Sequence, residues 1–328
     1  MASGMSILVG TVGQGVMRSA DGGEAWRRVG IDQGMHSDAI VRCLANHPSQ
    51  PEVVFAGTDR GLLRSDDAGG MWRRVESPLN DQCVWKVAIH PADPTVLFAG
   101  TGTPNPACVY RSDDGGRRWR DLSVDVVDHC DAVGVPRVTG LAIDPIDTST
   151  VWVGFEVDGA RVSRDGGESW SNVGGAIPNP DVHAVVVTRG PPRSVFVVVN
   201  NDVFVSRDDG GSWSPVGAAA VFPWVYSRGI AVKPDQPTTP LLAIGDSTPG
   251  RTGTVMRTTD TGGTWAPVEL PFAPNSAMWV VDVQPEDPNV VFAASRYGYL
   301  YRSDDAGESW TKLWREFSEV SSVLWTPN

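Results

Sequence analysis

Residues suited to binding chemistry recur at one position in the chain, six residues before a proline that ends an apolar run. Those residues are Arg42, Trp85, Thr139, Arg228, Trp279 and Ser321. One apolar run lacks its proline at this spacing, and aligning Val185–Val187 with the other runs adds His183. Arginine binds carboxylates through paired hydrogen bonds, and tryptophan offers its face to cations and rings. The set therefore predicts a site for a small anionic molecule that is sugar-like or aromatic.

Charged segments between the apolar runs supply candidate reactive groups. Glu156 and Asp158 lie in a long loop, and together with His183 they are the predicted general acid or base. Arg296 and Tyr297, in a shorter loop, are predicted to contact the substrate. A competing interpretation is that the loop acids are simply solvated, the arginines pair with them and the tryptophans fill space.

No cofactor and no metal ion are predicted from the residue spacing. The four cysteines are 40, 25 and 22 residues apart without a C-x-x-C pair, so they form neither a structural zinc site nor a disulfide framework. A weak alternative is a metal held by His36, His129 and His183, with Asp131 or Cys130 as a further ligand. These histidines lie far apart in the chain, so spacing alone does not support the alternative.

A repeat in the sequence indicates the elements that must position these residues. The pattern Ser/Thr-x-Asp-x-Gly-x-x-Trp occurs seven times, and its tryptophans are separated by 46, 47, 51, 43, 52 and 45 residues. Asp and Ser accept backbone N–H bonds in turns, glycine adopts positive φ, and tryptophan packs a large apolar face. A motif repeated this often is predicted to be part of the scaffold.

Each repeat unit contains four strand signals. In the third unit these are Trp85–Pro91, Val96–Thr101, Val109–Ser112 and Trp119–Leu122. Four strands in a unit of this length are typical of a β-propeller blade. The sequence therefore predicts an all-β, seven-bladed propeller with four antiparallel strands per blade.

The two ends of the chain are predicted to share one blade. Ile7–Thr11 matches the second strand of a unit, and Ser321–Pro327 matches the first. We therefore expect one domain over residues 5–328, with the first blade made of 5–30 plus 318–327 and with Met1–Gly4 as an added tail. The binding residues then lie at one mouth of the central channel, opposite the motif turns.

The motif resembles the Asp-box, or BNR, repeat, and the resemblance covers nearly the whole chain. Sialidases of this family use an arginine triad, a tyrosine nucleophile with a carboxylate partner, and an aspartic acid. The resemblance implies a glycoside hydrolase in which Arg42, Arg228 and either Arg137 or Arg296 act with Tyr226 or Tyr297. The chain departs from sialidases in its blade number, since they have six blades, and in lacking their Phe-Arg-Ile-Pro segment.

Two other functional classes stay open. The chain is also similar to photosystem II assembly factors, which are single seven-bladed Asp-box propellers without enzymatic activity. That similarity implies a non-catalytic module that binds a ligand or a protein partner. A lyase, isomerase or cyclase acting on a small metabolite would use the same mouth of the channel.

Composition excludes several partners. The 328 residues carry 27 Lys and Arg against 39 Asp and Glu, a net charge of −12, so neither nucleic acid nor an anionic membrane is an expected partner. The first residues lack the basic start and apolar run of a secretory signal, which favours a cytoplasmic protein. Secretion remains an alternative if a signal peptide precedes the given sequence.

Overall fold

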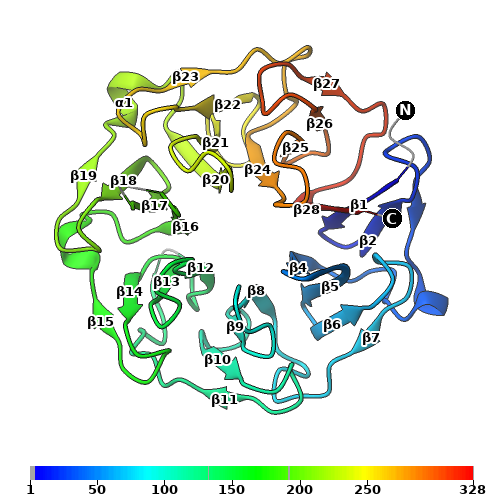
Figure 1. Ribbon diagram of the computed structural model, residues 1–328, viewed down its shortest axis with the longest axis horizontal. Helices are drawn as coiled ribbons and strands as arrows, with labels where there is room; N and C mark the ends of the chain where they lie inside the picture. The colour runs from blue at the N-terminus through cyan, green and yellow to red at the C-terminus, as the bar shows by residue number, and fades with distance from the viewer. Residues whose placement is uncertain (1–3, 132, 191–192, 328) are drawn as a thin grey trace.

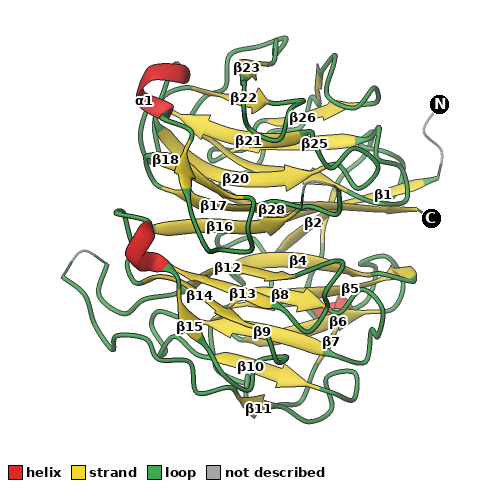
Figure 2. Cartoon of the chain, turned by 60° about the vertical axis from the view of Figure 1, so that its left-hand side comes forward, coloured by secondary structure: helices red, strands yellow, loops and turns green. Residues whose placement is uncertain are grey.

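The chain folds into seven four-stranded sheets arranged in a ring (Figure 1). The computed structural model describes residues 4–131, 133–190 and 193–327. Every pairing within a sheet is antiparallel, and Figure 2 shows the sheets from the side. The predicted all-β, seven-bladed propeller is confirmed.

The strands of a blade are ordered from the channel outward. The inner strands are β28 (Val320–Pro327), β4 (Val41–His47), β8 (Val84–Ile89), β12 (Val138–Ile143), β16 (Val182–Val187), β20 (Tyr226–Val232) and β24 (Met278–Val283). The second strands are β1 (Met5–Thr11), β5 (Gln50–Thr58), β9 (Leu97–Thr101), β13 (Val151–Phe155), β17 (Val195–Val199), β21 (Pro240–Gly245) and β25 (Val291–Ser295).

The outer half of each blade is shorter. The third strands are β2 (Val16–Ser19), β6 (Gly61–Ser65), β10 (Val109–Ser112), β14 (Gly159–Ser163), β18 (Asp202–Ser206), β22 (Gly253–Arg257) and β26 (Leu300–Ser303). The outermost strands are β3 (Arg27–Arg28), β7 (Arg73–Arg74), β11 (Arg120–Asp121), β15 (Ser171–Asn172), β19 (Ser214–Pro215), β23 (Ala266–Pro267) and β27 (Thr311–Lys312). In the described residues, the helices are α1 (Ala218–Val221) and two 3-10 turns, Ile31–Gln33 and Gly174–Ala176. Within the described ranges, no helix has the length and apolar character needed to cross a membrane.

The C-terminal strand completes the N-terminal blade. β28 pairs with β1 from Met5 opposite Pro327 to Thr11 opposite Val320. The chain ends therefore close the ring as the sequence predicted, and the edge of β1 that faces the channel is covered.

The seven motif repeats form the turns between the third and fourth strands. In the blade of β16–β19, the Ser206 hydroxyl donates to Asp208 at 2.8 Å and accepts the Gly210 N–H at 2.8 Å. The same two bonds occur in the other six turns. The motif is a structural turn, and each turn is stabilised from within.

Apolar side chains pack between neighbouring blades. Ile7 and Val9 of β1 pack against Phe292 of the preceding blade, while Leu8 packs toward Val54 of the following blade. Successive residues of a strand point to opposite faces, so a second strand buried on both faces reads as a continuous apolar run. These interfaces hold the blades in place around the channel.

A β-bulge interrupts every inner strand near its start. In β4 the register passes from Val41 to Cys43, and in β8 from Val84 to Lys86, so Arg42 and Trp85 have no paired residue. The skipped residues in the other blades are Thr139, His183, Arg228 with Gly229, Trp279 and Ser321. A bulge re-aims the side chain of the extra residue. The bulges thus fall at the seven positions that the proline spacing and the alignment of Val185–Val187 selected.

Candidate functional site

A cavity of about 890 Å³ occupies the channel at the level of the bulges. All seven bulge side chains line it: Arg42, Trp85, Thr139, His183, Arg228, Trp279 and Ser321. Neighbouring strands of a blade run antiparallel, so the starts of the inner strands and the motif turns lie on opposite faces of the ring. The cavity is of the size that small-molecule sites have.

Two tryptophans in the cavity wall are each covered by two arginines. The guanidinium carbons of Arg42 and Arg137 lie 4.1 and 5.0 Å from the ring centroid of Trp85. Those of Arg228 and Arg296 lie 4.4 and 4.3 Å from the ring centroid of Trp279. The cation–π contacts orient four guanidinium groups, two over each tryptophan of the cavity lining.

The four arginines differ in their ionic partners. Arg137 forms an ion pair with Glu156, and Arg296 forms one with Glu319 at 2.6 Å. Among the described residues, no carboxylate lies within ion-pair distance of Arg42 or Arg228. Neither Arg42 nor Arg228 is therefore neutralised by an ion pair with a described side chain, although Arg228 acts electrostatically on Glu156 and Asp181.

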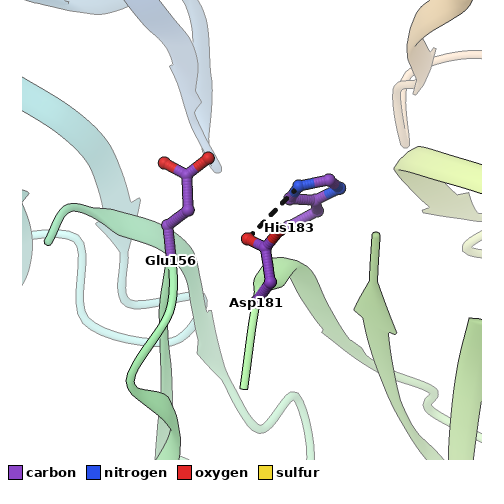
Figure 3. Close-up of side chains that lie close together, drawn as sticks. All are labelled: Glu156, Asp181 and His183. Carbon is purple, nitrogen blue, oxygen red and sulfur yellow. Dashed lines mark ion pairs between the residues drawn. The ribbon is translucent and has the colours of Figure 1, made fainter. Parts of the chain in front are cut away.

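Three side chains form a polar cluster in the cavity: Glu156, Asp181 and His183 (Figure 3). One ligand-type atom from each lies within 4.8 Å of the other two. The His183 Nδ1 lies 2.6 Å from the Ser227 carbonyl oxygen, which can only accept a hydrogen bond, so Nδ1 carries the proton. The Nε2 lone pair then faces Asp181, whose Oδ1 lies 3.5 Å away.

Burial dominates the protonation of this cluster. It lowers the pKa of His183 well below its usual value, helped by the positive charge of Arg228. Burial also raises the pKa of Glu156 and Asp181, which Arg228 and Arg137 partly oppose. A neutral imidazole thus lies beside two carboxyl groups that hold their protons more strongly than usual.

Aromatic rings continue from the cluster to Trp279, which Arg228 and Arg296 cover. The rings of His183 and Tyr226 meet edge-on at 5.4 Å, and Tyr226 stacks on Trp279 at 6.1 Å. A planar or ring-shaped molecule in the cavity would meet apolar faces on this side and charged groups elsewhere.

The structure brings together most of the predicted site residues. Glu156 and Arg296 line the cavity with the bulge residues, although the Thr139 hydroxyl is already bonded to the Val182 carbonyl. Asp158 and Tyr297 are absent from the cavity lining. Asp158 instead pairs with Arg161 at 2.8 Å, so its carboxylate is not placed for the predicted acid–base role.

The alternative histidine metal site is not assembled among the described residues. His36 and His129 are exposed, and the described cluster around His183 contains neither of them. The cavity holds Asp181 in their place, together with Lys86 and Asp282, which the sequence analysis did not single out. Asp181 lies directly before β16, two residues ahead of the bulge residue His183, so the six-residue proline spacing does not select it.

Comparison with known proteins gives partial and distant matches. A family model, Sortilin-Vps10 (sortilin, neurotensin receptor 3), matches residues 14–138, and no curated protein sequence matches the chain. The GH74 xyloglucanase from Xanthomonas campestris is 22% identical with a TM-score of 0.63, and it covers 83% of this chain and 45% of its own. An ancestral GH74 enzyme is 15% identical with a TM-score of 0.61, covering 96% and 54%.

A second kind of similar structure matches the chain in length. YCF48 bound to D1 peptide is 20% identical with a TM-score of 0.60, and the match covers 89% of this chain and 85% of that protein. The chain spans about half of each GH74 structure, 45% and 54%. Together the matches support one conclusion about identity: the chain belongs among the β-propellers.

Proposed function

We propose that the channel cavity binds a small anionic molecule with a sugar-like or aromatic ring. Arg42 and Arg228 bind its acidic group, and Trp85 and Trp279 offer the adjoining apolar surface. The observation that carries the proposal is the pair of cavity arginines without a carboxylate partner among the described residues. A charge taken out of water is costly unless an opposite charge or hydrogen bonds compensate it, and a bound anion would compensate both arginines.

The polar cluster provides the reactive end of the proposed site. Glu156 and His183 are the groups that would donate and accept protons if the ligand is converted, as in a glycosidase-like hydrolase or in a lyase or isomerase. The Glu156 and Asp181 oxygens lie within 4.8 Å of each other, less than the roughly 6.5–9.5 Å between the carboxyl groups of inverting glycosidases. Chemistry on this cluster would therefore follow a route other than attack by a water held between those two acids.

The motif turns support assignment of the chain to the Asp-box propellers. The bonds that link Ser or Thr to Asp and Gly repeat in all seven turns, as the turn-forming residues of the motif predicted. The match in length to YCF48 favours a second candidate, a propeller that binds a peptide without converting it. In that case an acidic peptide side chain would enter the same cavity.

A ligand screen followed by charge-removing variants tests the proposal. Sugar acids, aromatic carboxylates and acidic peptides are screened by thermal shift, and hits are measured by calorimetry. Arg42→Met and Arg228→Met keep a long side chain on each tryptophan but remove the charge. Loss of a charge-assisted bond of about 1.5–3 kcal/mol weakens affinity roughly 10- to 100-fold.

The matched control is Arg251→Met, because Arg251 is an exposed arginine in a loop near the cavity. This variant is expected to bind the ligand like the wild type. Equal affinity in Arg42→Met, Arg228→Met and the wild type would overturn the proposal. A hit recovered unchanged identifies a binding protein, and a hit recovered as product identifies an enzyme.

A further inference from the structure

We infer that Glu156, Asp181 and His183 form a binding site for a divalent transition-metal cation of the zinc type. The inference goes beyond the proposed function, because a cation can bind there with no anionic ligand present. The three residues supply one imidazole nitrogen and two carboxylate groups, a donor set that such cations accept. The geometry around each donor supports the assignment.

His183 is held as metal-ligating histidines are held. Its Nδ1–H donates to the Ser227 carbonyl oxygen at 2.6 Å, which fixes the ring and leaves Nε2 as the ligand atom. The residue is 5% exposed, so solvent does not compete freely for that lone pair. Nε2 points to Asp181, and no donor in the described part of the chain lies within hydrogen-bond distance of it.

Asp181 has one oxygen engaged and one directed to the cluster. Asn200 Nδ2 donates to Oδ2 at 2.8 Å, while no donor among the described residues reaches the buried Oδ1. Oδ1 lies 3.5 Å from His183 Nε2. Two ligands about 2.1 Å from one metal at a tetrahedral angle would be roughly 3.4 Å apart, so this separation suits a shared cation.

Glu156 completes the set from the neighbouring blade. Its carboxylate pairs with Arg137, an outer contact of the kind that orients a ligating carboxylate. Its ligand oxygen lies within 4.8 Å of the other two donor atoms, so a modest side-chain rotation brings it to the same centre. Three protein ligands leave coordination positions open to the cavity, as in catalytic rather than structural zinc sites.

The surrounding charges set how tightly the cation is held. Arg137 and Arg228 act electrostatically on Glu156 and Asp181, so they already offset part of the negative charge. A divalent cation then leaves the site with net positive charge that an anionic ligand can neutralise. Removal of the Arg228 charge should strengthen metal binding, although the same change weakens binding of the proposed anion.

Titration of the full chain with Zn²⁺ tests the inference. After treatment with a chelator and its removal, calorimetry is expected to show one Zn²⁺ per chain. Glu156→Gln, Asp181→Asn and His183→Gln should each weaken binding at least about 10-fold, and Arg228→Met should strengthen it. Co²⁺ in place of Zn²⁺ should give a visible absorption spectrum that His183→Gln abolishes.

The control is His129→Gln, which removes an exposed histidine outside the cluster. Circular dichroism establishes that each variant is folded. If His183→Gln does not fold, the near-isosteric Glu156→Gln and Asp181→Asn still test the site. No saturable binding to the wild type, or binding unchanged in all three cluster variants, would overturn the inference. A screen without anionic hits would count against the proposed function alone, since Zn²⁺ binding needs no such ligand.

Discussion

Asp282 places a carboxyl group in the channel wall away from the polar cluster. Gln284 donates to its two oxygens at 2.7 and 2.6 Å. Burial and the charge of Glu286 raise the pKa of Asp282 to about 7, although the Gln284 bond opposes the shift. The folded protein therefore binds a proton at Asp282 over a pH range in which the unfolded chain has released it.

Asp282→Asn should make the protein less sensitive to pH. A raised folded-state pKa means that stability from this group is greatest below about pH 4 and falls as the pH rises to about 7. The free energy of unfolding of the variant should therefore depend less on pH. At pH 8 it should exceed the wild-type value by at most about 4 kcal/mol. Urea unfolding at several pH values measures the effect, with the exposed Glu269→Gln as control. A slope equal to that of the wild type would contradict this assignment.

Individual site residues could be predicted from the sequence where a proline follows the inner strand at the six-residue spacing. Arg42 and Trp279 were found this way, six residues before Pro48 and Pro285. Asp181 was missed because the proline spacing and the strand alignment select only the bulge residue of each blade, here His183, and Asp181 lies two residues before it. Asp158 was chosen as a loop carboxylate, but Arg161, three residues later, pairs with it and holds it outside the cavity lining. Loop position therefore does not reveal where a carboxylate points.

The motif turn is the recurring element of the molecule, and its serine is buried in each copy that bears one. Ser206 is 1% exposed and links Asp208 to the Gly210 N–H. Trp213 departs from the pattern, since its indole nitrogen has no partner among the described residues, whereas the other six motif tryptophans donate to their glycine carbonyls. Its ring instead meets Trp152 edge-on at 6.0 Å.

Ser206→Ala should destabilise the protein by about 1–3 kcal/mol, because the Gly210 N–H loses its acceptor in a partly buried turn. The matched control is Ser214→Ala, an exposed serine of the same blade. Chemical denaturation gives both free energies of unfolding. Equal values for the two variants would show that the hydroxyl does not stabilise the turn.

Strands were predictable as elements because each blade repeats one pattern. The expected Val96–Thr101 and Val109–Ser112 correspond to β9 and β10 within one residue. The outermost strand was harder, since Trp119–Leu122 was expected and only Arg120–Asp121 pairs. The bulges could not be predicted, because an unpaired residue is defined by its partner strand and not by its own sequence.

Closure of the ring depends on a strand distant in sequence from its partner. Val320, Val323, Leu324 and Trp325 of β28 are each less than 5% exposed. At about 1.5–3 kcal/mol for each buried apolar side chain, their loss is comparable to the roughly 5–15 kcal/mol of a whole domain.

Deletion of residues 318–328 should therefore leave a chain without cooperative thermal unfolding at 25 °C or above. A synthetic peptide of residues 318–328, added to the shortened chain, should restore the transition by pairing with β1. The same peptide with Trp325→Ala serves as the control and should restore it less well. Near-ultraviolet circular dichroism follows the result, and an unchanged melt after deletion would refute the role of β28.

The blade number could be predicted for the whole molecule because one motif marks each blade. The meeting of Glu156, Asp181 and His183 could not, since their donor atoms converge across two blades. Likewise, the sequence could not show which arginines have an acidic partner, because this depends on how separate loops fold over the channel. Arg137 and Arg296 form ion pairs, whereas Arg42 and Arg228 form none with a described residue.

The bulge in every inner strand also bears on how such a protein changes over evolutionary time. The extra residue has no partner in the ladder, so its side chain can be exchanged without altering strand pairing elsewhere. The seven bulge positions already hold five different residue types. Each blade thus contributes one independently variable residue to a common chamber, and new selectivity can arise by single substitutions while the ring itself stays intact.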